Sequence, residues 1–252
     1  MFGRVVCINL DDRPDRWALA QQAHACLGEA RPLERFSAAR VRVCGNDVVN
    51  GRAGCLLSHR RAIEAAHRDG VESLLVFEDD VEFTREVAPI LVEGLASLAA
   101  LPWDMAFFGL EPRAPLFPVA PRLARVLHGA TTHAVAYHRR LYPRLLAALP
   151  EEDGVLEWLA RHTAVDRYYC DILLPRIQGY AIVPFVAHQR AGYSDVEGMQ
   201  LPPKAEATPL ASMPRFSWAW RRSLWEVLRP VRWLLRRERA WRFRAKPGVT
   251  PA

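Results

Sequence analysis

Short apolar runs of strand length alternate with segments of helical periodicity along much of the chain, and this alternation limits the folds open to it. The runs are rich in Val, Ile, Leu and aromatic residues and end at polar or turn residues, as buried strands do. They occupy 4–10, 73–77 and 103–110, and the helical segments occupy 14–27, 54–67 and 89–101. This order predicts an α/β fold with a mostly parallel, mixed, Rossmann-like sheet flanked by helices. Ligands of such folds bind beyond the carboxyl ends of strands.

The later part of the chain has a less regular order. Strands are predicted at 123–128, 130–137 and 180–186, and helices at 139–149, 155–160 and 166–177. Prolines interrupt 112–121, where we expect no regular element.

Basic residues are concentrated near the C-terminal end. The whole chain has 34 Lys and Arg against 28 Asp and Glu, but 215–247 alone holds ten Arg and Lys246 against Glu226 and Glu238. The remainder is therefore mildly acidic, which argues against a nucleic-acid-binding body. We expect a catalytic or binding domain at 1–201, a proline-rich linker at 202–214 and a basic tail at 215–252.

The tail has the pattern of a basic amphipathic helix. Trp220, Leu224, Val227 and Val231 recur at helical steps, and arginines fall largely on the other faces. Trp and Arg together suit a helix lying on an anionic membrane surface. Packing on the body or an oligomer contact are the alternatives. With no apolar stretch of membrane-spanning length and no signal peptide, we expect a cytoplasmic protein, peripheral at the inner face of the plasma membrane.

Three consecutive carboxylates, Glu78, Asp79 and Asp80, follow the predicted strand 73–77. Side chains alternate along a strand, so Glu78 and Asp80 should project to one side and Asp79 to the other. Neighbouring carboxylates repel, and a hard divalent cation such as Mg²⁺ or Mn²⁺ would stabilise them while leaving positions for substrate phosphates. The alternative is that the triplet only keeps the strand end soluble.

Three motifs together resemble a known family. Asn9-Leu10-Asp11-Asp12-Arg13-Pro14-Asp15-Arg16 follows the first strand, Gly54-Cys55-Leu56-Leu57-Ser58-His59 is helical, and Glu78-Asp79-Asp80 ends a strand. In this order and spacing they resemble glycosyltransferase family 25, which includes bacterial lipooligosaccharide enzymes and collagen galactosyltransferases. A weaker resemblance continues through Val165-Asp166 and Tyr193-Ser194-Asp195-Val196.

The resemblance implies a GT-A type fold and a metal-dependent, inverting glycosyltransferase. The donor would be a UDP-sugar, commonly UDP-galactose, and the acceptor a lipid-linked saccharide, lipopolysaccharide or another cell-surface glycan. It implies Mn²⁺ (or Mg²⁺) at Asp80, with Asp79 and His188 as further candidate ligands. The candidate donor-binding residues are Asn9, Arg13, Arg16, Ser58, His59, Glu78 and Asp79.

Two of these candidates depend on the position of a helix. Ser58 and His59 are expected in the first turns of their helix, where free backbone N–H groups favour an anion. A structural role for His59 is the alternative.

Inverting transfer also needs a carboxylate that takes the acceptor hydroxyl proton. Asp166 is the candidate base, because the family often carries an aspartate there after an apolar residue; helix capping is the alternative. Asp171 and Asp195 are the fallback bases. Gln189, Ser194 and Asp195 are expected in a loop that closes over the donor.

The sequence is also compatible with two rival functions. One is a metal-dependent transferase or hydrolase that acts on another nucleotide diphosphate. The other is a non-catalytic membrane adaptor or nucleic-acid-binding protein that works through the basic tail.

Overall fold

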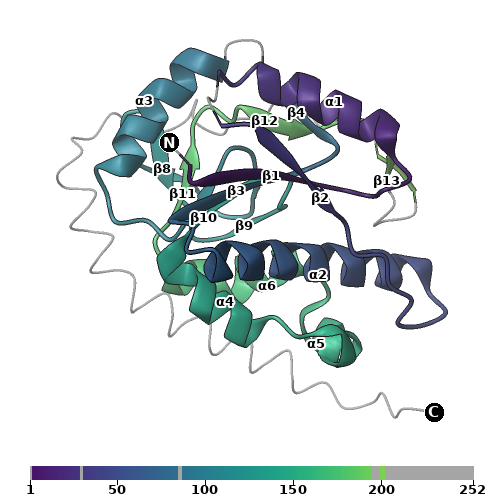
Figure 1. The fold of residues 1–252 in the computed structure, drawn as a ribbon. Coiled ribbons are helices and arrows are strands. Elements are labelled where there is room, and N and C mark those ends of the chain that lie inside the picture. The colour runs from purple at the N-terminus through teal and green to yellow at the C-terminus, as the bar shows by residue number, and fades with distance from the viewer. Residues whose placement is uncertain (1, 29–30, 85–86, 195–198, 202–252) are drawn as a thin grey trace. The chain divides into compact units, whose positions relative to one another are not determined.

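An eight-stranded sheet forms the centre of the protein in a computed structural model that describes residues 2–28, 31–84, 87–194 and 199–201 (Figure 1). Its strand order is β2-β1-β3-β10-β5-β11-β8-β7. The strands, in that order, are Leu33–Ser37, Arg4–Asn9, Ser73–Glu78, Ala134–His138, Met105–Phe107, Gly179–Ile182, Leu123–Arg125 and Phe117–Ala120. Strands β10 and β8 are antiparallel to their neighbours, and the other strands of the sheet all run in one direction. The predicted mostly parallel, mixed α/β sheet is confirmed.

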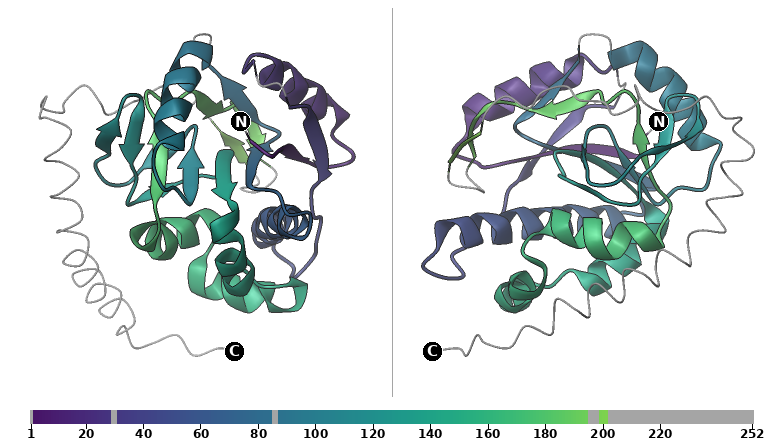
Figure 2. Two further views of the ribbon diagram at one scale, coloured as in Figure 1. Left: turned by 60° about the vertical axis from the view of Figure 1, so that its left-hand side comes forward. Right: turned by 180° about the vertical axis from the view of Figure 1, so that it is seen from behind.

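Helices cover both faces of this sheet (Figures 1 and 2). One face carries α1 (Pro14–Ala25) and α3 (Val87–Ala99). The other carries α2 (Asp47–Arg68), α4 (Tyr142–Ala148), α5 (Val155–His162) and α6 (Val165–Tyr168). The sheet is buried between these layers, as its almost continuous apolar strands require.

Three two-stranded pairs complete the described part of the chain. They are β12 (Ala187–Gln189) with β4 (Val81–Phe83), β13 (Gly192–Ser194) with β14 (Met199–Leu201), and β6 (Glu111–Pro112) with β9 (Gly129–Ala130). The first pair brings residues 187–190 beside the end of the acidic triplet. The predicted linker 202–214, the tail 215–252 and Asp195 lie outside the described residues.

Two strands were not expected from the sequence. β2 is half exposed along its length, so it lacks the apolar run that marks a buried strand. β7 lies inside 112–121 and contains Pro118, in contrast to the expectation of no regular element there. Because β7 is the last strand of the sheet, proline costs it no ladder hydrogen bond on its outer side.

Helix α2 begins seven residues earlier than the predicted start at 54. Asn46 is its N-cap, with Oδ1 accepting a hydrogen bond from the amide of Val49 at 3.2 Å. Oδ1 of Asn50 in turn accepts from the amides of Val43 and Cys44, which holds the preceding loop against the first turn. The cap residue and the acidic first turn were the sequence signals for this earlier start.

The predicted helix 166–177 is divided among three helical forms. An α-helical turn, α6, is followed by a π-helical turn at Tyr169–Leu173 and a 3-10 turn at Leu174–Arg176. Among the described residues, no helix combines the length and the apolar character needed to cross a membrane.

Candidate active site

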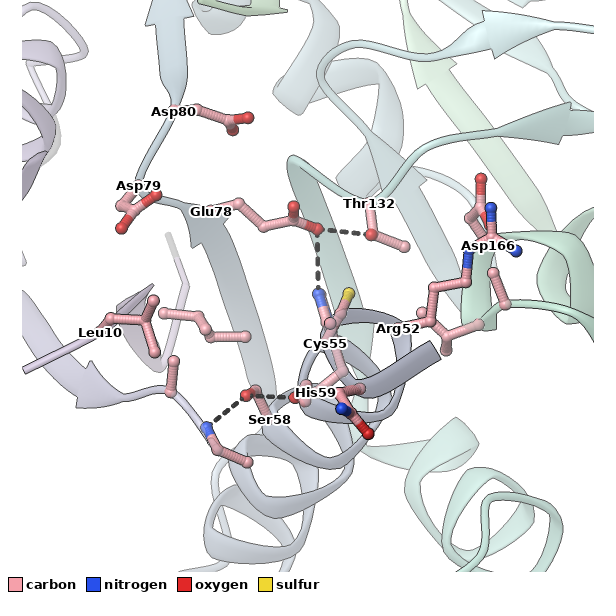
Figure 3. A pocket seen from close by; sticks show the side chains of 18 of the residues that line it. Leu10, Arg52, Cys55, Ser58, His59, Glu78, Asp79, Asp80, Thr132 and Asp166 are labelled. Carbon is pink, nitrogen blue, oxygen red and sulfur yellow. Dashed lines mark hydrogen bonds and ion pairs between the residues drawn. The ribbon is translucent and has the colours of Figure 1, made fainter. Parts of the chain in front are cut away.

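A cavity of about 760 Å³ lies at the carboxyl ends of β1, β2 and β3 (Figure 3). This is the position that the sheet direction predicts for a ligand site. Its walls come from the segments after β1 and β2, from the first half of α2, from the acidic triplet, and from the loops before β10 and α6. The residues that line it include Arg16, Arg40, Arg42, Arg52, Cys55, Ser58, His59, Glu78, Asp79, Asp80, Thr131, Thr132, Asp166, Arg167 and Gln189.

The three carboxylates of the triplet point in different directions. Glu78 is the last residue of β3, and Asp79 and Asp80 form the turn that leads into β4. Figure 3 shows Glu78 and Asp80 directed to the same side and Asp79 turned away from them. The alternation expected from strand geometry is therefore found at this strand end.

Asp79 is engaged by two protein donors. Its Oδ2 accepts a hydrogen bond from Nδ2 of Asn9 at 2.7 Å, and its Oδ1 pairs with Arg16 at 3.1 Å. The residue is 8% exposed. Burial raises the pKa of Asp79, and the contacts with Asn9 and Arg16 offset only part of that rise. Asn9 itself is fully buried, so Asn9, Arg16 and Asp79 join β1 and α1 to the end of β3.

Glu78 anchors a buried hydrogen-bond network. Thr132 donates its hydroxyl to Oε1 of Glu78 at 2.5 Å, and Nε2 of His59 lies 3.3 Å from the same oxygen. Nδ1 of His59 lies 3.0 Å from the hydroxyl of Tyr137, which reaches the hydroxyl of Tyr169 at 3.4 Å. Burial by itself would raise the pKa of Glu78. The hydrogen bond and positive charge of His59, together with the hydrogen bond from the Thr132 hydroxyl, outweigh burial and lower this pKa. The structure therefore keeps Glu78 as a carboxylate.

The expectation that Ser58 and His59 lie in the first turns of a helix is wrong. Because α2 begins at Asp47, both residues are in its middle, where the backbone N–H groups are already used. The Ser58 hydroxyl accepts from the amide of Ala39 at 2.8 Å and donates to the carbonyl of Gly54 at 2.6 Å. Ser58 thus fixes the segment after β2 against α2, and His59 reaches the site through Glu78.

Asp80 lies beside the strand β12. Its Oδ2 accepts a hydrogen bond from Nε2 of Gln189 at 3.4 Å, and its carbonyl accepts one from the amide of Arg190 at 2.6 Å. Asp80 and Gln189 both line the cavity. His188 is placed opposite Glu82 in the β12–β4 pair and does not line the cavity.

Asp166 lies in the first turn of α6 and lines the cavity. The N-cap of this helix is Ala164, so the alternative that Asp166 serves as the cap is wrong. Oδ2 of Asp166 accepts a hydrogen bond from the amide of Thr131 at 3.3 Å. Figure 3 shows Asp166 across the pocket from Asp79 and Asp80.

Other candidates lie away from the cavity. Arg13 pairs with Asp15 on the surface, and Asp171 pairs with His128. Neither Arg13 nor Asp171 lines the cavity. Ser194 is in β13.

Several residues that line the cavity were not predicted from the sequence. Thr132 precedes β10 and Cys55 lies one turn before His59, yet only their tertiary contacts place them at Glu78. Arg40, Arg42, Arg52 and Arg167 bring positive charge to the cavity wall. No spacing rule connects these arginines, because they come from three separate segments.

Two groups of described residues could hold a metal ion through a nitrogen, a sulfur and an oxygen atom. They are Cys55 with His59 and Glu78, and His128 with Cys170 and Asp171. Within each group the ligand atoms lie within 4.8 Å of one another. Asp80 belongs to neither and offers carboxylate oxygens alone.

Solved structures that resemble this chain do so weakly in both sequence and shape. A glycosyltransferase involved in the glycosylation of the major capsid of PBCV-1 is 12% identical, with 71% of this chain and 79% of that chain covered and a TM-score of 0.41. A197 from STIV is 9% identical, with 80% and 95% covered and a TM-score of 0.41. Mannose-1-phosphate geranyltransferase from Thermus thermophilus is 14% identical, with 71% and 58% covered and a TM-score of 0.36. No curated protein matches the sequence.

A family comparison agrees with the motifs. Residues 33–101 match the model of glycosyltransferase family 25 (LPS biosynthesis protein). The matched segment runs from β2 to α3 and includes Ser58, His59 and the triplet Glu78–Asp80 on the cavity wall. Over this segment the chain is similar to glycosyltransferase family 25.

Proposed function

We propose that this enzyme transfers a hexose, with galactose as our first candidate, from a UDP-sugar to a lipopolysaccharide or another cell-surface glycan. The transfer would invert the anomeric configuration and depend on a divalent cation. The observation that carries the proposal is that Glu78, Asp80 and Asp166 line one cavity from opposite sides. A donor bound at the first two carboxylates would place its sugar toward the third.

Asp80 is the residue that we assign to the cation, together with Glu78. Both supply carboxylate oxygens to the cavity, and such hard donors suit Mn²⁺ or Mg²⁺. A bound divalent cation offsets the negative charge that builds on the departing diphosphate. Because both oxygens of Asp79 are held by Asn9 and Arg16, we assign Asp79 to positioning the turn, and we assign no metal role to His188.

Glu78 is also placed to orient the donor. His59 and Thr132 hold it ionised, so it can accept hydrogen bonds from ribose hydroxyls as well as face a cation. The arginines Arg40, Arg42, Arg52 and Arg167 on the cavity wall suit a ligand that carries phosphate.

Asp166 is our candidate for the general base. It is half buried on the cavity wall, and the Thr131 amide fixes its carboxylate. The remaining carboxylate oxygen could take the proton of the attacking acceptor hydroxyl as the new glycosidic bond forms.

The experiment compares three variants by calorimetry with UDP and Mn²⁺ and by release of UDP from UDP-galactose. Asp80→Ala should lose Mn²⁺-dependent UDP binding and about 100-fold or more of turnover. Asp166→Asn should bind UDP like the wild type but turn over about 100-fold more slowly. Asp153→Ala, a change at an exposed aspartate that does not line the cavity, is the matched control and should behave as wild type. Wild-type binding and turnover in Asp80→Ala would overturn the proposal.

We propose further that residues 215–252 bind anionic membranes and so bring the enzyme to a lipid-linked acceptor. The sequence pattern of Trp and Arg supports this role. Flotation with anionic vesicles should be lost when 215–252 are deleted, while UDP release is kept. Flotation that survives the deletion would count against the tail.

A further inference from the structure

Outside the cavity, His128, Cys170 and Asp171 bring three different kinds of metal ligand together. His128 directly precedes β9, and Cys170 and Asp171 are in the π-helical turn at Tyr169–Leu173, against which β9 packs. None of the three lines the cavity. Single π-helical turns are frequent at functional sites.

The geometry of the cluster suits a metal ion. An imidazole nitrogen, the thiol sulfur and a carboxylate oxygen all lie within 4.8 Å of one another, and Nε2 of His128 is 2.5 Å from Oδ1 of Asp171. Zinc ligands at ordinary bond lengths lie roughly 3–4 Å apart, so small side-chain rotations would bring the three atoms into place.

Exposure gives the cluster an entrance. Cys170 is buried, the His128 side chain is 21% exposed and the Asp171 side chain is 57% exposed. Solvent therefore reaches two of the three candidate ligands, and the third lies within 4.8 Å of them. Three protein ligands leave a fourth position for water.

We propose that His128, Cys170 and Asp171 form a site for a zinc-like transition-metal ion. A mixed nitrogen, sulfur and oxygen donor set favours zinc and related ions over Mg²⁺ or Mn²⁺, which prefer oxygen. On binding, the Cys170 thiol gives its proton to solvent and coordinates as the thiolate.

The site would connect the two segments that position the cavity carboxylates. Thr131 and Thr132 follow β9 and contact Asp166 and Glu78. The helical segment that contains Cys170 begins at Val165 and carries Asp166 in its first turn. An ion held between His128 and Asp171 would fix these two segments against each other. This consequence rests on the proposed function, but the metal site itself does not.

The test uses Co²⁺ as a spectroscopic stand-in for zinc on the full-length protein after treatment with a chelator. A thiolate ligand gives Co²⁺ a charge-transfer absorption in the near ultraviolet, so we expect this band to saturate at one ion per chain. Cys170→Ser should abolish it, and His128→Gln and Asp171→Asn should weaken Co²⁺ binding at least about tenfold. Cys55→Ser and Cys26→Ser, which change the cavity thiol and an exposed thiol, should keep the band.

Asp171→Asn serves as the control for folding, because it changes an exposed side chain. Zinc should raise the melting temperature of the wild type, and Asp171→Asn should keep the wild-type melting temperature without zinc but respond less to it. A band that persists in Cys170→Ser and disappears in Cys55→Ser would assign the ion to the cavity and overturn the proposal. So would a wild-type protein with no such band. UDP binding enters none of these readouts, so a failed donor proposal would leave them unchanged.

Discussion

Asn9 and Asp79, seventy residues apart in the chain, are joined by a hydrogen bond of 2.7 Å in the interior of the protein. Asn9 ends β1, and Asp79 follows the end of the neighbouring strand β3. The bond connects the two strand ends that carry the first and third motifs of the family resemblance. It also gives a buried carboxylate one of its two donors.

Replacing Asn9 tests this connection. Asn9→Ala leaves Asp79 with Arg16 alone and removes the other hydrogen bonds of the Asn9 side chain, so we expect the free energy of unfolding to fall by about 1–3 kcal/mol. Urea unfolding measures the change. Ser37→Ala removes an exposed hydrogen bond to Asp11 at the next strand end and should cost no more than about 0.5 kcal/mol. Equal losses in the two variants would contradict an energetic role for the buried bond.

The pKa of Asp79 predicts a pH dependence of stability. Because burial raises this pKa in the folded protein, the folded state holds the Asp79 proton more tightly than the unfolded state. The contribution of Asp79 to stability is therefore fully present below the unfolded pKa and is lost as the pH rises through the folded pKa. Asp79→Asn cannot lose a proton there, so its stability relative to wild type should increase over that range. If the curves of unfolding free energy against pH are parallel for the wild type and Asp79→Asn, the pKa of Asp79 is not raised in the folded protein.

Glu78 should show the opposite pH dependence through Thr132. The folded pKa of Glu78 is lowered, so its contribution to stability is present above the unfolded pKa and is lost as the pH falls through the folded pKa. Thr132→Val keeps the side-chain shape but removes the hydroxyl donor, which should cost about 1.5–3 kcal/mol at neutral pH and less in acid.

Thr84→Val is the matched control for Thr132→Val. The Thr84 hydroxyl is buried and makes no hydrogen bond within the part of the chain that the structure describes. Thr84→Val should therefore leave the free energy of unfolding unchanged, both at neutral pH and in acid. A Thr132→Val loss that does not shrink in acid would contradict the link to the charge of Glu78.

Gly54 allows α2 to approach the segment after β2. A Cβ at this position would lie 2.5 Å from the carbonyl oxygen of Ala39. Alanine favours a helix by about 1 kcal/mol over glycine, but the contact with a backbone oxygen cannot be relieved by a rotamer change. We expect Gly54→Ala to lower the unfolding free energy by about 1–3 kcal/mol. Gly45→Ala, where a Cβ meets nothing within 4 Å, should be close to neutral, and a stabilised Gly54→Ala would contradict the close approach.

Cys55 reports on the charge of the cavity. Burial, with the negative charges of Glu78 and Asp166, raises its pKa well above the ordinary range, so it should react slowly with iodoacetamide at neutral pH. Glu78→Gln removes a negative charge and should increase the rate. Peptide mass spectrometry can follow Cys55 beside the exposed Cys26, whose rate should not change. An unchanged Cys55 rate would show that Glu78 does not act on the thiol.

Local features of the sequence were sufficient for the main elements that carry the site. The apolar runs marked β1 and β3, and Pro14 marked the first residue of α1. The alternation of side chains correctly separated Asp79 from Glu78 and Asp80 at the strand end. These outcomes depend on neighbours a few residues apart, which is the range over which periodicity and capping act. The edge strand β2 was missed because half-exposed residues carry a weak periodic signal.

Long-range contacts decided what each site residue does. The sequence alone indicated a mostly parallel sheet, an acidic triplet at a strand end and motifs that resemble those of glycosyltransferase family 25. Only the tertiary structure showed that Asp79 is held by Asn9, that Glu78 is held by His59 and Thr132, and that Asp166 caps no helix. The physical reason is that a carboxylate's charge and orientation depend on the donors around it, and here those donors come from strands and helices far away in the sequence.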